Sequence, residues 1–174
     1  PALPSVGVRG VFAKEMIEPV ARVMQEIGYE KAIVLHGEVA GTGLGMDEAS
    51  VCGPTFCSRI SDSGMERFSI EPERLGLLAR DPQALTPEPD RQAEVRRFAA
   101  LMLNRESGPR KDAILLNAGL IFLAAGEADS LDQGIERSAG LLEDGRAFAK
   151  LESWVQAQNP DPARGLETLH RLVA

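Results

Sequence analysis

Two adjacent carboxylates, Asp47 and Glu48, are the residues whose types and spacing could do chemistry in this chain. They end a glycine-rich stretch, residues 37–46, which follows an apolar run and His36. Magnesium prefers oxygen ligands, keeps several waters, and is usually held by one or two protein carboxylates together with substrate phosphates. The pair therefore suits Mg²⁺, although adjacent acids are more often solvated surface residues. General acid–base catalysis is less favoured, because it normally needs burial to separate the two pKa values.

The glycine-rich stretch contains the run GTGLG, residues 41–45, which is suggestive of a phosphate cradle. Such cradles lead into the start of a helix, and no helix start follows here. A flexible loop is therefore the favoured interpretation. His36 ends a predicted strand, at the edge where α/β sheets form ligand sites. A structural histidine that hydrogen-bonds the following loop is favoured over a catalytic one.

Two further groups of residues are interpreted as structural. Arg110 and Lys111 open a predicted helix, where a solvated or salt-bridged helix start is favoured and a phosphate contact has no support. Cys52 and Cys57, with only two histidines in the chain, do not make a recognisable zinc pattern. We expect both cysteines to be reduced, small apolar residues of a cytosolic fold.

The bulk properties are those of a soluble globular protein. The chain has 174 residues, 44% of them hydrophobic and 26% charged, which suits one domain with a sizeable core. A net charge of −7 argues against non-specific nucleic-acid binding. No secretory signal and no apolar run of membrane-spanning length is visible, so we expect a cytoplasmic protein. Because the chain starts at Pro1 and enters a strand-like run almost at once, we interpret it as the carboxyl part of something longer.

Hydrophobic periodicity predicts a mixed, mainly parallel sheet flanked by helices. A strand at residues 6–12, a helix at 14–27 and a strand at 31–36 make a βαβ unit, which implies parallel neighbours. Pro19 makes the first turn of that helix irregular or delays its start. Residues 48–52 and 65–70 are predicted as two further strands, antiparallel because few residues separate them.

The second half of the chain is predicted to be mostly helical. Residues 72–78 suggest a short helical turn and residues 81–90 an extended surface loop. Asp90 can cap a helix, Gly126 can end a buried helix at residues 111–125, and Ser130 with Gln133 fits a capping box. The residues expected to face inward from these helices and from two later ones are Val95, Phe98, Leu101, Met102, Leu131, Ile135, Leu142, Ala147, Phe148, Leu151, Trp154, Val155, Leu166, Leu169 and Leu172.

Several stretches together resemble one family. The runs VLHGE, MDEAS, CGPT, GPRKDAILLNAG and AGEADSLDQG occur in the order, and with roughly the spacing, of the carboxyl-terminal part of anthranilate phosphoribosyltransferase. Pro1 and Ala2 resemble the end of that family's asparagine-proline-alanine stretch. The resemblance covers about residues 1–157. Its most specific blocks are GPRKDAILLNAG and AGEADSLDQG, because helix formation does not demand their polar residues.

The resemblance implies an incomplete large domain of a nucleoside-phosphorylase/phosphoribosyltransferase-like fold. Residues 1–158 would be the carboxyl-terminal part of the catalytic domain and 159–174 a helical tail. The family acts as a homodimer in tryptophan biosynthesis, transferring the phosphoribosyl group of phosphoribosyl diphosphate to anthranilate with release of diphosphate. Asp47 and Glu48 fall on the family's magnesium-binding acidic pair, which makes Mg²⁺ the expected cofactor.

The chain also departs from the family. The family's phosphate loop and its anthranilate-contacting arginine would lie before Pro1, so we expect the 174 residues alone to be inactive. The loop between His36 and Asp47 is longer than usual, residues 81–90 do not reproduce the family's stretch, and the tail is extra. A related phosphoribosyltransferase or nucleoside-phosphorylase-like enzyme with another acceptor stays open. So does a non-catalytic nucleic-acid-binding relative, against which the net charge speaks.

Overall fold

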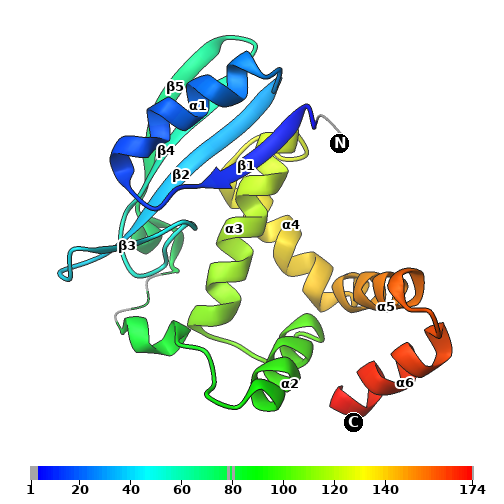
Figure 1. Cartoon of the computed structure of the whole chain (residues 1–174). Helices are drawn as coiled ribbons and strands as arrows, with labels where there is room; N and C mark the ends of the chain where they lie inside the picture. Colours follow the sequence, from blue (N-terminus) through cyan, green and yellow to red (C-terminus); the bar gives the residue numbers. More distant parts are fainter. Residues whose placement is uncertain (1–3, 78, 80, 174) are drawn as a thin grey trace.

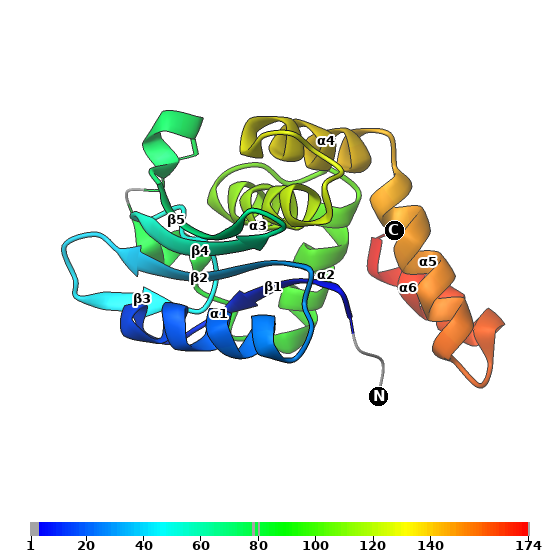
Figure 2. The ribbon, with the colours of Figure 1, turned by 90° about the horizontal axis from the view of Figure 1, so that it is seen from above.

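The first half of the chain forms a mixed β-sheet, and a helix covers each of its faces (Figures 1 and 2). The computed structural model describes residues 4–77, 79 and 81–173. Within them lie five strands, β1 (Val6–Gly10), β2 (Lys31–Val39), β3 (Leu44–Met46), β4 (Thr55–Ser61) and β5 (Gly64–Ile70). The order is β1-β2-β4-β5, and β3 pairs with the end of β2. The predicted α/β class is confirmed.

The predicted βαβ unit is present. β1 and β2 are parallel, and they are joined by a 3₁₀ turn, η1 (Lys14–Met16), and helix α1 (Ile17–Glu26), so the first turn is irregular as expected. The pairings β2–β3, β2–β4 and β4–β5 are all antiparallel. The expected predominance of parallel pairing is therefore wrong within the described residues. The physical reason is connection length, because a tight turn such as the one between β4 and β5 can join only antiparallel strands.

One predicted strand is wrong and two strands, β3 and β4, were missed. Residues 48–52 form an irregular segment that is buried from Ala49 onward, and the strand follows them as β4. β4 pairs with β2 on one side and β5 on the other, so it is interior to the sheet. The predicted strand at residues 65–70 is confirmed as β5.

β2 is buried on both faces, which accounts for its unbroken apolar run. Ala32 and Val34 pack toward α1 together with Ile60 of β4. Ile33 and Leu35 pack on the opposite face against helix α3 (Pro109–Ala125). Burying one such side chain fully contributes roughly 1.5–3 kcal/mol. Successive side chains of β2 thus point to opposite faces of the sheet, so this one strand packs against a helix on each side.

The remaining elements follow the sheet in the chain. They are η2 (Pro72–Leu75), η3 (Pro82–Leu85), α2 (Arg91–Met102), α4 (Leu131–Glu143), α5 (Arg146–Gln158) and α6 (Pro162–Val173). The predicted turn at 72–78 is seen as η2, while its Leu78, like Pro1 and Ala2 of the family resemblance, lies outside the described residues. The predicted extended loop at 81–90 instead contains η3.

The predicted helix caps are confirmed. The Asp90 carboxylate accepts hydrogen bonds from two backbone N–H groups of the first turn of α2, each at 3.1 Å. Ser130 Oγ accepts from the backbone N–H of Gln133 at 3.3 Å, whereas the Gln133 side chain accepts from the N–H of Asp129 instead of that of Ser130, so only half of the predicted capping box is present. Gly126 ends α3 in the left-handed conformation, with φ of 74°. Local hydrogen bonds decide these ends, which is why sequence alone locates them.

The predicted inward faces are partly wrong. In α2, Val95 and Phe98 are exposed, and Ala99 and Leu101 are the buried residues. α5 has no buried residue, and its Trp154 is 60% exposed. α5 packs beside α6, which also contacts α2 (Figure 1). Among the described helices, none combines the length and apolar character needed to cross a membrane.

Candidate functional site

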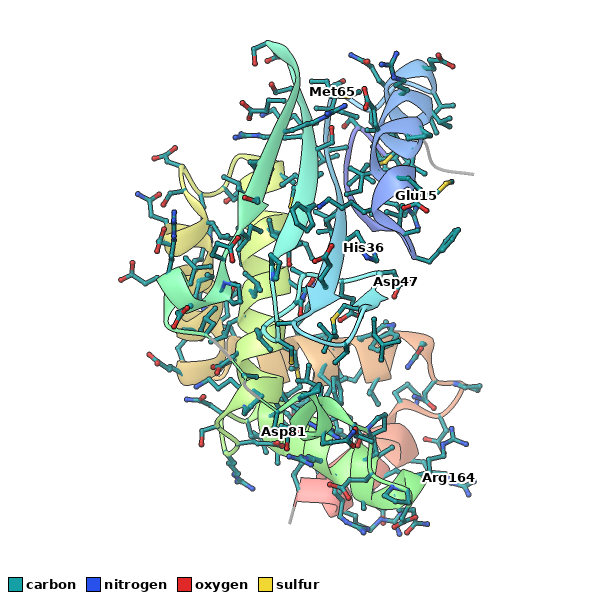
Figure 3. The ribbon with its side chains drawn as sticks, turned by 90° about the vertical axis from the view of Figure 1, so that its left-hand side faces the viewer. Glu15, His36, Asp47, Met65, Asp81 and Arg164 are labelled. Carbon is teal, nitrogen blue, oxygen red and sulfur yellow. The ribbon has the colours of Figure 1, made fainter. Side chains whose placement is uncertain are left out.

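Asp47 and Glu48 follow β3 at the end of the sheet where the parallel strands β1 and β2 both finish. Figure 3 shows Asp47 at the same end of the sheet as His36 and far from Met65. Both acids are exposed. Among the residues that the structure describes, neither forms an ion pair. Two carboxylates without a cationic partner in the described part of the chain therefore face solvent at the edge where open α/β sheets bind ligands.

Two glycines, Gly10 at the end of β1 and Gly37 within β2, let the backbone of the acidic pair approach these strands closely. A Cβ built on Gly10 would lie 1.5 Å from the carbonyl oxygen of Asp47. A Cβ built on Gly37 would lie 2.4 Å from the carbonyl oxygen of Glu48. Neither distance leaves room for a side chain. The acidic pair is thus seated directly on β1 and β2.

The stretch before the acids is a β-hairpin, which corrects the prediction of a flexible loop. β2 extends to Val39, and β3 returns antiparallel to it, with Met46 opposite Gly37 and Leu44 opposite Val39. Gly41 and Gly43 have φ of 75° and 71°, conformations that glycine adopts without strain. The glycines therefore make a tight turn, and a three-residue ladder places the acids.

His36 supports this hairpin. It is buried, and its Nδ1 lies 2.8 Å from the carbonyl oxygen of Val11. Since a carbonyl can only accept, Nδ1 carries the proton. A Cβ on Gly45 would lie 2.3 Å from Nε2 of the same ring, so the imidazole fills the space beneath β3. His36 therefore makes a hydrogen bond within the fold, as expected, but its partner is Val11 rather than the loop that follows.

The segment after the acids is anchored through side chains, which explains why residues 48–52 do not form a strand. The Asn117 amide of α3 binds both backbone groups of Ala49: its Oδ1 accepts from the N–H at 2.9 Å and its Nδ2 donates to the carbonyl at 3.0 Å. Ser50 N–H donates to Thr55 Oγ1 at 2.8 Å. These backbone groups are satisfied by side chains and need no neighbouring strand.

Asn117 is the supporting residue that sequence reasoning missed. Its signal was a polar amide inside the apolar helix predicted at residues 111–125. The predicted salt-bridged start of that helix is confirmed, because Arg110 pairs with Glu94 at 2.7 Å and Lys111 donates to Asn104 at 2.6 Å. Arg110 and Glu48 both line a cavity of about 380 Å³ between the acidic loop and α2.

The two cysteines are free and buried, as expected. Burial raises the pKa of the Cys57 thiol from 9.0 to about 12. It also raises the pKa of Cys52, with a smaller contribution from the Asp81 charge. Thiols of this kind stay protonated at neutral pH and lack the thiolate needed for nucleophilic chemistry.

The donor set at the acidic pair suits magnesium. Among the described residues, no group of three or more histidine, cysteine, aspartate or glutamate side chains comes together to hold a metal. A closed all-protein site is therefore not formed there. Two exposed carboxylates match the way Mg²⁺ is bound, with water and substrate oxygens as its other ligands.

Comparison with known proteins agrees with this architecture. The family described as "Glycosyl transferase family, a/b domain" matches residues 1–148, so the chain belongs to that family. It is 35% identical over 156 residues to the anthranilate phosphoribosyltransferase of Rubrobacter xylanophilus, covering 90% of this chain and 44% of that protein. It is also 35% identical over 143 residues to the corresponding Exiguobacterium sibiricum enzyme, covering 82% of this chain and 40% of that protein.

Solved structures of enzymes with that name share the fold. The anthranilate phosphoribosyltransferase of Thermus thermophilus superposes with a TM-score of 0.71 at 30% identity, covering 83% of this chain and 40% of that one. A variant of the Saccharomyces cerevisiae enzyme, solved with Mg bound, has a TM-score of 0.69 at 21% identity, which shows the fold alone; the match covers 83% of this chain and 41% of that one. The chain thus spans about two fifths of the length of the relatives it matches.

Proposed function

We propose that this chain is the metal-binding, carboxyl-terminal part of the α/β domain of an anthranilate phosphoribosyltransferase. The whole enzyme would transfer the phosphoribosyl group of phosphoribosyl diphosphate to anthranilate, with release of diphosphate, in tryptophan biosynthesis. Family membership and the names of the relatives support the reaction class. The observation that carries the proposal is a pair of exposed carboxylates, Asp47 and Glu48, beside the ends of β1 and β2, with no ion-pair partner among the described residues.

In this proposal Asp47 and Glu48 hold Mg²⁺ at the edge of the sheet. When bound, the metal would neutralise the negative charge of the diphosphate leaving group. The chain's own contribution is to keep two carboxylates exposed, adjacent and free of cationic partners, among the described residues, that would compete with a metal. The close contacts of Gly10 and Gly37 serve this by leaving the acids little backbone freedom. The Mg-bound yeast relative supports the choice of metal.

The wider setting is part of the same proposal. We place residues 1–158 in the catalytic α/β domain and treat 159–174 as an added helical tail. The full-length enzyme would be a cytoplasmic homodimer that meets phosphoribosyl diphosphate and anthranilate. The 174 residues alone would not turn over these substrates, since the matched relatives have the larger part of their length outside the region shared with this chain.

The test is a calorimetric titration of Mg²⁺ and diphosphate into the unchanged protein and into two double variants. The double variant Asp47→Ala/Glu48→Ala should lose most of the magnesium-dependent affinity for diphosphate. The matched control is Glu143→Ala/Asp144→Ala, which removes another exposed pair of adjacent acids, at the end of α4, and should bind as the unchanged protein does. Equal affinity in all three proteins would remove Asp47 and Glu48 from the mechanism.

One observation favours a second candidate, a related transferase with a different acceptor. The β2–β3 hairpin leads directly into Asp47, and Leu44 of this hairpin is 67% exposed. An enlarged hairpin here changes the surroundings of the acids without changing the acids themselves. Assaying the full-length enzyme with anthranilate and with other aromatic amines, each with phosphoribosyl diphosphate, separates the two candidates. Turnover of anthranilate alone supports the first.

A further inference from the structure

Asn117 of α3 uses its whole side-chain amide on the segment behind the acids. Oδ1 accepts the N–H of Ala49 at 2.9 Å, and Nδ2 donates to the Ala49 carbonyl at 3.0 Å and to the Ala113 carbonyl at 2.9 Å. The amide has one acceptor oxygen and two donor hydrogens, so all of its groups are engaged. Ala49 comes directly after Glu48 and is 1% exposed.

The helix itself does not require this residue. α3 fills the core with apolar side chains, among them the fully buried Leu116 beside Asn117. Asn117 is partly buried, and an amide withdrawn from water costs stability unless it is hydrogen-bonded, so an apolar residue would be the default here. The amide is therefore explained by what it binds, a backbone segment 68 positions away in the sequence.

The two acids lie between two restrained positions. On one side Met46 is held in the β-ladder opposite Gly37. On the other side Ala49 is held by Asn117. Asp47 and Glu48 are the whole of the segment between them, and their backbones lie close to Gly10 of β1 and Gly37 of β2. The direction in which both carboxylates leave the sheet therefore depends on where Ala49 is fixed.

We propose that Asn117 is a positioning residue for the metal-binding pair. By clamping the Ala49 peptide to α3 it sets the geometry of Asp47 and Glu48 without touching the metal. This inference rests on the proposed function, in which those two acids bind Mg²⁺. Replacing a residue that orients metal ligands without binding the metal itself typically lowers metal affinity by about 10–100-fold.

The experiment uses the 174-residue chain, Mn²⁺ as a paramagnetic probe in the presence of diphosphate, and Mg²⁺ as competitor. Asn117→Leu removes all three hydrogen bonds. Asn117→Asp has the same shape and keeps the acceptor for the Ala49 N–H but loses both donors, and it provides a second test if the leucine variant does not fold. Leu116→Ala is the control, since it destabilises the same helix and leaves the hydrogen bonds between Asn117 and Ala49 in place.

The expected result is a loss of Mn²⁺ affinity of about tenfold or more in both Asn117 variants and no comparable loss in Leu116→Ala. Hydrogen exchange of the Ala49 amide, which needs no metal, should accelerate in Asn117→Leu and not in the control. Unchanged affinity in the Asn117 variants, or an equal loss in the control, would overturn the positioning role. If the unchanged chain binds Mn²⁺ no better than Asp47→Ala/Glu48→Ala, the proposed function itself fails.

Discussion

The α-carbon of Gly10 and the carbonyl of Asp47 meet so closely that a Cβ on Gly10 would lie 1.5 Å from that oxygen. The last residue of β1 is therefore in direct contact with the first residue of the acidic pair, although α1 and the whole of β2 lie between them in the sequence. No L-residue with a side chain fits there unless the acidic segment moves. This contact joins the stability of the sheet edge to the placement of the candidate metal ligands.

Gly10→Ala should therefore destabilise the protein and displace the acidic pair. Forcing one methyl group into a filled site costs about 1–3 kcal/mol of unfolding free energy. Urea unfolding measures this loss, and Mn²⁺ titration with diphosphate should show weaker binding than in the unchanged chain. The matched control is Gly140→Ala in α4, where a Cβ meets nothing within 4 Å. Because alanine is the better helix former, that control should be stabilised by roughly 0.5–1 kcal/mol.

Two neighbouring residues of α3 should respond very differently to truncation. Leu120 is fully buried beneath the sheet, so Leu120→Ala should cost about 2–5 kcal/mol of unfolding free energy through lost burial and the cavity left behind. Ile121 is 57% exposed, and Ile121→Ala should cost far less. Thermal and urea unfolding of the two variants provides the measurement. Equal losses would mean that α3 presents a different face to the sheet.

The Asp90 cap offers a test of a local interaction. Its carboxylate accepts from the backbone N–H groups of Gln92 and Ala93, each at 3.1 Å. Asp90→Ala leaves these donors to water and should lower the unfolding free energy by about 1 kcal/mol. Asp90→Asn keeps an acceptor oxygen at the same place and should retain most of the stability. A loss in the asparagine variant as large as in the alanine variant would contradict the capping role.

The buried thiol of Cys57 predicts how stability depends on alkaline pH. Burial raises its pKa from 9.0 to about 12, so the folded chain keeps the proton that the unfolded chain releases first. The stability from this group is fully present below pH 9.0 and is lost as pH rises toward 12. In that window the loss approaches about 1.4 kcal/mol per pH unit.

The measurement is urea unfolding at a series of pH values above neutrality, for the unchanged chain and for Cys57→Ala. Other groups titrate in both proteins, including Cys52, whose pKa is also raised, so the difference between the two curves isolates Cys57. The difference in unfolding free energy between the two proteins should be constant below pH 9.0. Above pH 9.0 the unfolding free energy of the unchanged chain should fall relative to that of Cys57→Ala. Parallel curves throughout would show that the thiol titrates alike in both states.

The candidate site was only half accessible from the sequence. Asp47 and Glu48 could be singled out because two adjacent carboxylates are recognisable as a possible metal-binding pair from the sequence alone. The hairpin before them was predicted as a loop, since glycines mark both flexible segments and tight turns, and only the pairing of Met46 with Gly37 distinguishes the two. Asn117 could be noticed as an oddity in an apolar helix but not assigned, because its partner Ala49 lies 68 positions away.

By itself the sequence determined the features that depend on near neighbours. The β1-α1-β2 unit follows from local periodicity, and the caps at Asp90 and Ser130 follow from hydrogen bonds that span two or three residues. The tertiary structure decided which residues after the acids form a strand, and which face of α2 is buried. It also decided the contacts of Gly10 with Asp47 and of Asn117 with Ala49. In those cases segments far apart in the chain compete for backbone hydrogen-bond partners and for space. A local sequence pattern contains no information about that competition.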